Sequence, residues 1–475
     1  MTAPATHAFD FAARAMRGDV LQAGTRGRSF AGAAADSRQV AAGQLFFALP
    51  GERVDGFAFA AQAAASGAAG VVVAKGRGVP AGCEGLTVIA VDDPRLALGD
   101  LARAVRGQFH GHVVGVTGSN GKTTTKELVA AALRPLGAVL RTPGNFNTDV
   151  GLPLTILGAA GTEAAWILEM AMRARGEIAY LADVARPGVG VITNVAGAHL
   201  ERLGSIEEVA RAKGELFAGL GPEGIAVLPS GDPLIEEQAA PVAPERRITF
   251  EGATRGRGPI DVRVLETIAA GAAGAVVRYA ARGTPLVVRL PLAGAHNARN
   301  GAAALGVALA VGVPVVEAAR ALEALELPPH RSAVLAAGGR VVLDDCYNAN
   351  PDSMRAALAA VVASAGGGRA FAVLGDMLEL GPDEEALHRA VGREAGAKLA
   401  GLAGVGRLGA ALVEGAREAG LPEGRAIAAA TPEEAAARVA AWTGAGDWVL
   451  VKASRGMKLE RAVGALVETL KAGGR

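Results

Sequence analysis

The run GVTGSNGKTTTKE, residues 115 to 127, constrains the fold of this chain more than any other stretch. A short β-branched run, Val113 to Thr117, leads into it and predicts a buried strand. After it, Leu128, Ala132 and Leu136 recur at the spacing of one helical face. Strand, glycine-rich loop and helix in this order are typical of a parallel sheet whose loop cradles phosphate. The chain is therefore predicted to be an α/β protein.

The loop itself has the residue types of an ATP-binding site. Its backbone N–H groups can point at an anion because small or turn-forming residues build it, namely Gly118, Ser119, Asn120 and Gly121. Lys122 would neutralise the β- and γ-phosphates, and Thr123, followed by Thr124, would offer a hydroxyl to Mg²⁺. The usual pattern starts with glycine where this chain has Val116, so we expect the loop to turn on Gly118. An ordinary glycine-rich turn is the alternative, and kinase, hydrolase and ligase all remain open.

Length and charge limit the class of protein. With 475 residues, three domains of roughly 150 residues are the natural expectation. Lys and Arg total 48 against 47 for Asp and Glu, so no basic field would attract nucleic acid or an anionic membrane. Cys83 and Cys346 have no partner-like spacing and are expected to be reduced thiols. Without a long apolar run or a leader pattern, the protein is expected to be soluble and cytoplasmic. A monomer is also expected.

Strand-like and helical runs divide the chain into three segments, predicted at residues 1–108, 109–326 and 327–475. The first is a small α/β domain that ends in the polar link 106–112. The second alternates strands and helices, which predicts a mostly parallel sheet, with an antiparallel appendage at 260–290. The third repeats the alternation and predicts a second doubly wound sheet.

Polar residues follow the predicted strands of the second segment, at the edge where the phosphate loop lies. Glu169 follows the run AAWIL, and His199 follows VGVITNV. A carboxylate and an imidazole at this edge are candidate Mg²⁺ ligands. Each alone could be an ordinary surface residue, but their shared placement favours a site. Lys213 lies on a predicted helix, and by itself it would be a solvated lysine.

Two polar runs follow predicted strands of the third segment. They are DDCYNANPDSM (344 to 354) and VKASRGMKLE (451 to 460). Turn chemistry could account for the first run, and a helix start with surface charge could account for the second. Two such clusters at strand ends of one segment favour a binding face.

Seven runs, in order and spanning essentially the whole chain, resemble the Mur ligases. They are TGSNGKTTTKE, GNFNTDVGLPLT (144 to 155), TNVAGAHLERLGSIEEVARAKGELF (193 to 217), GAHNARN (294 to 300), DDCYNANPDSM, LGDMLELG (374 to 381) and VKASRGMKLE. The last four are most similar to the family member that acts on D-alanyl-D-alanine. The resemblance implies a UDP-binding N-terminal domain, a central ATPase domain and a Rossmann-like C-terminal domain.

The resemblance also implies a reaction. ATP would phosphorylate the terminal carboxylate of a UDP-MurNAc-tripeptide, and the amine of D-alanyl-D-alanine would attack the acyl phosphate to give an amide, ADP and phosphate. A sibling ligase that adds the third amino acid, a diamino acid, is the alternative within the family, but it usually carries an Asn-Pro-Arg type motif where this chain has NANPDSM. A non-catalytic ATP-dependent switch would leave Glu169, His199 and Lys213 without a purpose.

Carried over by position, the resemblance assigns roles to individual residues. Lys122 and Arg331 would act on the phosphates, Thr123 and Glu169 would hold one Mg²⁺, and His199 with a carbamylated Lys213 would hold a second. Further positions are assigned as follows: His296, Asn297, Asn300 and Asp345 to ATP; Ser37, Arg38, Asn145 and Asn147 to the UDP substrate; Tyr347, Asn348, Asn350, Lys452, Ser454 and Arg455 to the dipeptide and phosphates. The chain departs from the family pattern at His330, where glycine is common before the arginine, and at Ala171 and 173–175.

Overall fold

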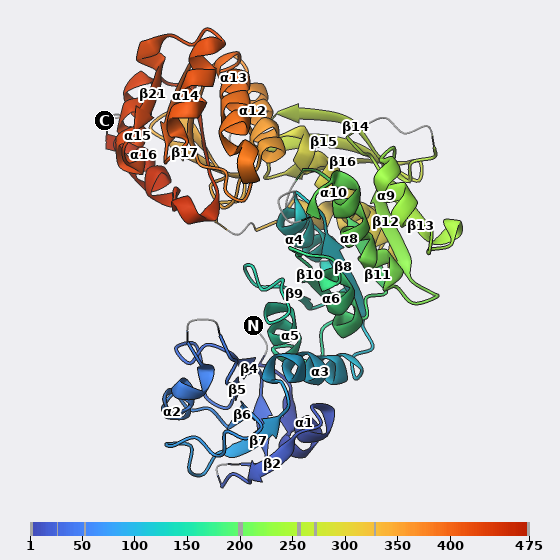
Figure 1. The fold of residues 1–475 in the computed structure, drawn as a ribbon. Coiled ribbons are helices and arrows are strands. Elements are labelled where there is room, and N and C mark those ends of the chain that lie inside the picture. The colour runs from blue at the N-terminus through green and yellow to red at the C-terminus, as the bar shows by residue number, and fades with distance from the viewer. Residues whose placement is uncertain are drawn as a thin grey trace.

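The structure is a computed structural model that describes residues 3–25, 27–51, 54–197, 203–253, 258–269, 273–326 and 329–472. Three α/β lobes follow one another along the chain, with the N-terminal lobe at one end and the C-terminal lobe at the other (Figure 1). The predicted fold class is confirmed. The strands of each large sheet fall within one predicted segment, while the predicted start of the third segment at residue 327 lies outside the described residues.

The N-terminal lobe is built on a five-stranded sheet of order β2-β7-β6-β5-β4 and a separate β1-β3 pair. Its strands are β1 (Thr6–Ala8), β2 (Asp19–Gln22), β3 (Ser29–Ala31), β4 (Ala33–Ala34), β5 (Leu45–Phe47), β6 (Gly70–Ala74) and β7 (Thr87–Val91). Its helices are α1 (Phe9–Ala15), η1 (Gly56–Phe59), α2 (Ala60–Ala65) and α3 (Pro94–Arg106). The apolar residues of β6 and β7 are buried, as expected for central strands.

The central lobe contains a nine-stranded sheet of order β16-β15-β14-β13-β12-β11-β8-β10-β9. Its strands are β8 (His112–Thr117), β9 (Val139–Arg141), β10 (Ala165–Glu169), β11 (Val189–Ile192), β12 (Ile225–Pro229), β13 (Arg247–Phe250), β14 (Val262–Ala269), β15 (Ala275–Ala281) and β16 (Thr284–Leu290). In the sheet order from β9 through β8 to β14, neighbouring strands pair in parallel. The predicted antiparallel appendage is confirmed, because β14, β15 and β16 pair antiparallel and extend the same sheet.

Helices cover both faces of the central sheet (Figure 1). They are α4 (Lys122–Ala132), η2 (Arg134–Leu136), α5 (Gly151–Leu157), α6 (Glu177–Ala185), α8 (Ile206–Ala218), α9 (Pro233–Gln238), η3 (Pro244–Arg246), α10 (Ala295–Ala310) and α11 (Val315–Leu322). In the sheet, Val116 of β8 lies opposite Glu169 of β10, and Thr117 lies opposite Ile192 of β11. The residues that follow these three strands therefore meet at one edge.

The C-terminal lobe is a six-stranded sheet of order β17-β18-β22-β19-β20-β21, parallel except for the edge strand β17. Its strands are β17 (Ala333–Ala337), β18 (Arg340–Asp344), β19 (Ala370–Gly375), β20 (Gly401–Val405), β21 (Ala426–Ala429) and β22 (Trp448–Lys452). Its helices are α12 (Pro351–Ala365), η5 (Gly381–Asp383), α13 (Glu384–Gly396), α14 (Gly409–Glu418), η6 (Glu423–Arg425), α15 (Pro432–Trp442), η7 (Arg455–Met457) and α16 (Glu460–Ala472). Separate apolar clusters on the two faces confirm the doubly wound prediction.

The predicted polar link at 106–112 is instead a packed junction. Phe109 is buried and stacks on Trp166 of β10 with ring centroids 3.9 Å apart. The Arg106 guanidinium donates hydrogen bonds to the carbonyl oxygens of Ala185 and Arg186, at 2.7 and 2.9 Å. Helix α3 packs on α5 and α6, so one apolar cluster runs from the N-terminal lobe into the central lobe. The prediction of a polar link overlooked Phe109, because its sequence neighbours are polar.

Two predicted helices are shorter than their apolar patterns suggested. Helix α4 ends at Ala132, and Leu136 is 36% exposed, so its assignment to the same helical face is wrong. Pro135 explains this ending, because proline disfavours helical backbone in the residue before it. The alanine-rich stretch at 57–69, whose composition predicts a single helix, is divided into η1 and α2 and ends before Gly67, whose φ is +96°.

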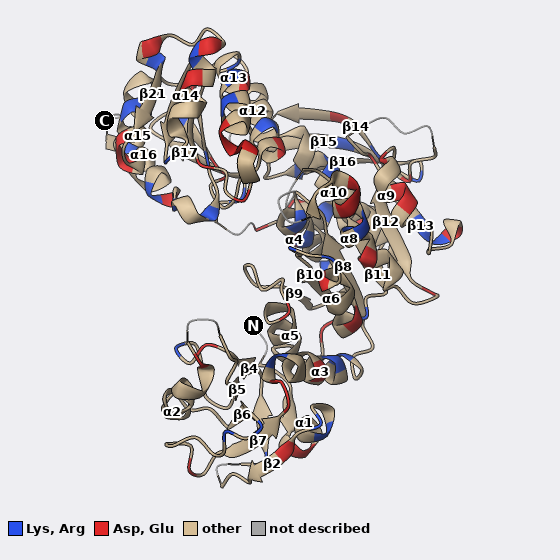
Figure 2. Ribbon diagram, viewed as in Figure 1, with Lys and Arg blue, Asp and Glu red and all other residues tan. Residues whose placement is uncertain are grey.

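Charged residues of both signs are interspersed over all three lobes (Figure 2), in keeping with the net charge of +1. Cys83 and Cys346 are both buried and form no disulfide, as predicted. None of the helices within the described residues is both long and apolar enough to span a membrane.

Candidate active site

The phosphate loop turns where the sequence predicted. Gly118 follows β8 with φ +152°, and a Cβ there would lie 1.9 Å from Oγ1 of Thr193. Gly121 has φ +78°, and a Cβ there would lie 2.8 Å from Oδ1 of Asn300. Both positions therefore require glycine, for conformation and for space. The short distance at Gly121 also shows that Asn300 of α10 lies beside the loop.

Two residues that follow β11 hold the loop in shape. The Asn120 N–H donates to Asn194 Oδ1 at 2.9 Å, while Thr193 Oγ1 and Asn194 Nδ2 donate to the Asn120 carbonyl oxygen at 2.6 and 2.9 Å. Ser119 is fixed in the same way, because its N–H donates to the Asn194 carbonyl oxygen at 2.9 Å. Sequence reasoning missed Thr193 as a site residue. The signal available was a Thr-Asn pair directly after a buried strand of the same edge.

Helix α4 begins at the loop with no side-chain cap, so its first N–H groups are directed at the space above the loop. Lys122 Nζ donates to the carbonyl oxygens of Gly118 and Ser119, at 2.7 and 3.2 Å. Burial lowers the pKa of Lys122, the Glu169 carboxylate opposes this, and Arg331 lowers it further. The loop lysine thus lies within electrostatic reach of a strand-end carboxylate and of a guanidinium from the C-terminal lobe. Thr123, the next residue, is buried.

Glu169 is a buried carboxylate, and one of its two oxygens accepts no hydrogen bond from the described residues. Asn147 Nδ2 donates to its Oε1 at 2.8 Å, and its backbone N–H donates to Thr142 Oγ1 at 2.9 Å. Its Oε2 has no hydrogen-bond partner within the described part of the chain, and Lys126 Nζ lies 3.9 Å away. An ionised, unpartnered oxygen in a buried site is costly, so this donor set fits a cation. Asn147, which the resemblance assigns to the UDP substrate, thus contacts this carboxylate.

Lys213 is 2% exposed, so the alternative of a solvated surface lysine is wrong. Helix α8 carries it inward, and Ser205 caps that helix by accepting a hydrogen bond from the Glu208 N–H at 3.3 Å. Burial lowers the pKa of Lys213 well below its ordinary value, and the charge of Lys122 lowers it further. Lys213 therefore lies near the phosphate loop and favours the neutral amine. His199, the other predicted ligand of this pair, lies outside the described residues.

The C-terminal lobe reaches the loop through Asn350. This residue caps α12, where its Oδ1 accepts from the Ser353 N–H at 2.9 Å, and its Nδ2 donates to Asn120 Oδ1 at 2.7 Å. Turn chemistry therefore explains only part of its role. Close approach is also seen at Gly294, φ +92°, where a Cβ would lie 2.7 Å from Cβ of Ala360 in α12.

The first residues of the second polar run of this lobe are buried, whereas Arg455 is exposed. Lys452 is 3% exposed, and its Nζ lies 2.5 Å from Asp345 Oδ2 and donates to the Asn348 carbonyl oxygen at 2.9 Å. Ser454 Oγ donates to the Ala349 carbonyl oxygen at 3.2 Å and accepts from a backbone N–H. The alternative of a helix start with surface charge is therefore wrong for Lys452 and Ser454, while Arg455 is exposed at the start of η7 (Arg455–Met457). They join the two polar runs into one unit.

Two guanidinium groups lie near the ring of Tyr347. Cζ of Arg331 is 3.7 Å from the centroid of its ring, and Cζ of Arg455 is 5.7 Å away. Such stacking orients a guanidinium while leaving its N–H groups available. The arrangement holds Arg331 at the entry to the C-terminal lobe, on the side that faces Lys122.

The residues assigned to the UDP substrate in the N-terminal lobe lie on loops of that lobe. Ser37 Oγ donates to Gln62 Oε1 at 2.8 Å, and Arg38 pairs with Asp36 at 2.7 Å. Hydrogen bonds from Arg38 lower the pKa of Asp36 to about 2. Asn145 belongs to the central lobe and is exposed.

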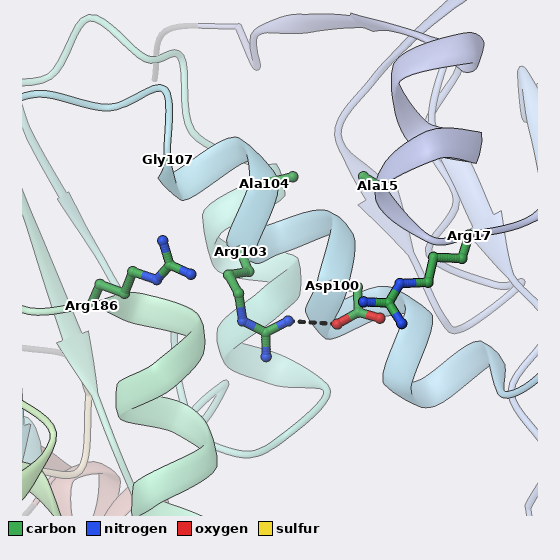
Figure 3. A pocket seen from close by; sticks show the side chains of 7 residues that line it. All are labelled: Ala15, Arg17, Asp100, Arg103, Ala104, Gly107 and Arg186. Atoms are coloured by element: carbon green, nitrogen blue, oxygen red, sulfur yellow. Dashed lines mark hydrogen bonds and ion pairs between the residues drawn. The ribbon is translucent and has the colours of Figure 1, made fainter.

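A cavity of about 300 Å³ lies elsewhere, where the N-terminal lobe meets the central lobe (Figure 3). Three arginines approach it from different elements, and Arg103 is paired there with Asp100. None of the predicted site residues lines this cavity. The predicted chemistry gathers at the strand ends instead.

Comparison with known proteins agrees with this geometry. Models of the Mur ligase middle domain, the Mur ligase glutamate ligase domain and the Mur ligase family catalytic domain match residues 116–308, 330–455 and 29–106. UDP-N-acetylmuramoyl-tripeptide--D-alanyl-D-alanine ligase of Bacillus subtilis is 36% identical over 447 residues, covering 92% of this chain and 93% of the relative. The chain belongs to the Mur ligase family. The resemblance inferred from the seven sequence runs is thereby confirmed.

Solved structures of Mur ligases have the same architecture as this one. MurF from Acinetobacter baumannii superimposes with a TM-score of 0.85 at 30% identity, covering 98% of this chain and 99% of that chain. MurF ligase from Thermotoga maritima in complex with ADP has a TM-score of 0.80 at 30% identity, covering 93% and 98%. This Mur ligase therefore shares a three-lobed α/β fold with enzymes of its family.

His296 provides a pH-dependent test of how this Mur ligase is packed. Burial lowers its pKa to about 4; the Asp345 carboxylate opposes this, while Arg299 and Lys452 add to it. In the unfolded chain His296 binds a proton as the pH falls through 6.5, whereas in the folded chain it binds one only at about pH 4. The free energy of unfolding therefore decreases as the pH falls across this window. Urea unfolding at pH 7 and pH 5 should show a larger loss for the wild type than for His296→Gln. Equal losses would contradict this placement of His296.

Asn350→Ala tests the contact between the lobes, with Thr431→Ala as its matched control. Each change removes a helix cap, because Thr431 Oγ1 accepts from the Glu434 N–H at 3.1 Å, and each should cost about 1 kcal/mol of stability. Only Asn350→Ala also removes a hydrogen bond to the phosphate loop, so only it should lower ATP turnover, by about fivefold. Thermal unfolding and ADP release measure the two effects. Equal turnover in both variants would mean that the contact with Asn120 has no catalytic role.

Proposed function

We propose that this Mur ligase joins D-alanyl-D-alanine to a UDP-MurNAc-tripeptide, with ATP as co-substrate and two Mg²⁺ ions as cofactors, as a cytoplasmic monomer. The observation that carries the proposal is the convergence of Lys122, Glu169, Lys213 and Arg331 from four separate elements. Such a set suits transfer of a phosphoryl group, because it combines cations, a metal-binding carboxylate and a nucleotide loop. The choice of substrates rests on the name of the Bacillus subtilis relative and on the NANPDSM run.

A carboxylate resists attack by an amine because its oxygen is a poor leaving group. In the proposed reaction the tripeptide carboxylate attacks the γ-phosphorus of ATP and releases ADP. The amine of D-alanyl-D-alanine then attacks the carbonyl carbon of the acyl phosphate, loses a proton and expels phosphate. Lys122 would leave its loop carbonyl partners to neutralise charge on the transferring group, and Arg331 would approach it from the other lobe.

The donor atoms near the loop fit the proposed Mg²⁺ sites. Glu169 Oε2 is unpartnered among the described residues, and Thr123 stands at the start of α4. Lys213 favours its neutral amine, which is the form that can add carbon dioxide to become a carbamate, an oxygen ligand for the second site together with His199. When bound, Mg²⁺ supplies charge neutralisation on the phosphates and on the leaving group.

The remaining contacts are proposed from position. His296, Asn297, Asn300 and Asp345 lie where α10 meets the C-terminal lobe and would surround the adenosine side of ATP. The unit of Asn348, Lys452 and Ser454, with Tyr347, Asn350 and Arg455 beside it, would receive the dipeptide. Ser37 and Arg38, with Asn145 and Asn147, would serve the UDP substrate. Because these residues lie on three lobes, the substrates would be enclosed between them.

The amine can be identified by phosphate release. The purified chain is supplied with ATP, Mg²⁺ and a UDP-MurNAc-tripeptide, with D-alanyl-D-alanine as the acceptor. A parallel reaction contains the UDP-MurNAc-dipeptide and a diamino acid. The proposal predicts phosphate release only in the first reaction. Turnover only in the second would identify the sibling ligase, and ATP binding without turnover in either would identify a switch.

A further inference from the structure

A cluster of metal-ligand side chains lies apart from the proposed catalytic residues. Within the described ranges, one group of three His, Cys, Asp or Glu side chains has all its ligand atoms within 4.8 Å of one another, and its members are His330, Asp344 and Cys346. Asp344 ends strand β18, Cys346 follows it, and His330 precedes strand β17. These two strands are neighbours, so the cluster is fixed by the sheet rather than by one flexible loop.

Asp344 and Cys346 are buried, His330 is partly buried, and Asp344 contacts both of the others. His330 Nδ1 lies 2.8 Å from Asp344 Oδ2, and the Cys346 N–H donates to Asp344 Oδ1 at 3.4 Å. Asp344 is 3% exposed and Cys346 is fully buried. A fourth group, Glu460 at the start of α16, interacts electrostatically with both His330 and Cys346. Its Oε1 accepts a hydrogen bond from Arg455 Nη1 at 2.9 Å, and its Oε2 is buried with no hydrogen-bond partner among the described residues.

The backbone at His330 is unfavourable for a residue with a side chain. Its φ is +66°, a left-handed conformation that glycine adopts without cost. A histidine there costs of order 1 kcal/mol, and such strain persists where the side chain is held by its surroundings. Here the imidazole is held against Asp344 and directed at the cluster.

We propose that His330, Asp344 and Cys346, with Glu460 as the fourth ligand, bind one divalent transition-metal ion of the zinc class. Nitrogen, sulfur and oxygen donors in a set of four are those of a tetrahedral zinc site. Donor atoms in such a site are about 3.5 Å apart, so the ligand atoms of His330, Asp344 and Cys346, which lie within 4.8 Å of one another, need to close by about 1.3 Å at most. Mg²⁺ is disfavoured because it requires oxygen ligands, whereas a thiolate selects softer ions.

Binding would replace a proton with the metal. Burial raises the pKa of the Cys346 thiol, and the Asp344 carboxylate raises it further, so the empty site holds a neutral thiol. On binding, the S–H bond breaks, a sulfur–metal bond forms and the proton leaves to solvent, so one proton is released per ion. The charge of the ion then compensates for the buried thiolate and the two carboxylates.

A metal ion bound at this cluster would also affect Arg331 and Asp345, which are proposed to contact the nucleotide. His330 directly precedes Arg331, and Asp344 directly precedes Asp345. An ion that joins His330 to Asp344 would hold the two backbone segments together and stiffen the base from which Arg331 and Asp345 extend. The metal would thus stabilise the folded C-terminal lobe, and the temperature of its unfolding should rise when Zn²⁺ is added.

Cobalt provides a readout that the proposed Mg²⁺ sites cannot give. The full chain, freed of metal by a chelator, is titrated with Co²⁺ and then with Zn²⁺. Thiolate ligation gives Co²⁺ an intense near-ultraviolet charge-transfer band, and none of the residues proposed to bind Mg²⁺ has a thiol. The expected result is a band that saturates at one ion per chain and disappears when Zn²⁺ displaces Co²⁺.

Three variants test the assignment. Cys346→Ser should abolish the band, and Cys83→Ser, which changes the other cysteine, should keep it. His330→Gly removes a ligand while suiting the left-handed backbone, so this variant should fold and bind Co²⁺ at least tenfold more weakly. Circular dichroism establishes folding in each case. The proposal is overturned if the folded wild type gives no band, if the band survives in Cys346→Ser, or if His330→Gly binds as tightly as the wild type.

Discussion

Replacing Lys213 by alanine is expected to lower the rate of ADP release by 10²- to 10³-fold, on the order found when one stabilising group is removed from a transition state. The side chain is 2% exposed and its pKa is lowered by burial and by Lys122, so it is poised to be neutral and to react with carbon dioxide. In the proposed mechanism its carbamate is an oxygen ligand of the second Mg²⁺ ion, and this variant removes that ligand. Steady-state ADP release at saturating ATP measures the loss.

Chemical rescue separates this role from simple packing. Short carboxylic acids such as acetate should restore part of the activity of Lys213→Ala, because they can occupy the vacated space with a carboxylate. Arg211→Ala is the matched control, since Arg211 lies on the same helix, is exposed and pairs with Glu208. That variant should keep its activity. Full activity in Lys213→Ala, or failure of every short acid to rescue it, would show that Lys213 does not serve a metal.

Lys122→Ala is expected to reduce ADP release by a similar or larger factor, at least about 10²-fold. Its Nζ contacts the carbonyl oxygens of Gly118 and Ser119 at 2.7 and 3.2 Å, which places the ammonium directly over the loop. Because the lysine is proposed to contact the transferring group, the loss should appear in the maximal rate and not only in the affinity for ATP. Lys471→Ala, at the exposed end of α16, provides the control and should be unchanged.

Thermal unfolding shows whether Lys122→Ala loses activity because it is less stable. Lys122 is held by loop carbonyls rather than by a buried ion pair, so its removal should change the unfolding temperature little. A variant that unfolds at the wild-type temperature and still turns over ATP at the wild-type rate would contradict the assignment of Lys122 to the phosphates.

The strand, loop and helix around Lys122 could be predicted from the sequence because the signal is local. A β-branched run, small residues and a Gly-Lys-Thr triplet specify the backbone of the loop without reference to the rest of the chain. The alternation of strands and helices likewise predicted the parallel sheets. Position relative to a strand's end then placed Glu169 at the loop, where the structure has it.

Contacts between distant segments could not be predicted in this way. From the sequence alone, Lys213 is predicted to be a solvated lysine on a helix. Its burial follows from the packing of α8 on the sheet. Asn350 has the local signature of a helix cap, which its hydrogen bond to Ser353 satisfies, and nothing local indicates its contact with Asn120. The burial of Phe109 at the junction of two lobes was not predicted, because its sequence neighbours are polar. Local composition cannot say which lobe a side chain will meet.

The central claim is that ATP activates a peptide carboxylate so that an amine can attack it. It is tested most directly by labelling the terminal carboxylate of the UDP-MurNAc-tripeptide with ¹⁸O and supplying ATP, Mg²⁺ and D-alanyl-D-alanine. An acyl phosphate intermediate requires one carboxylate oxygen to leave with the phosphoryl group. The account predicts that the released phosphate carries one ¹⁸O atom for each amide formed. Phosphate without ¹⁸O, formed alongside the amide, would contradict it.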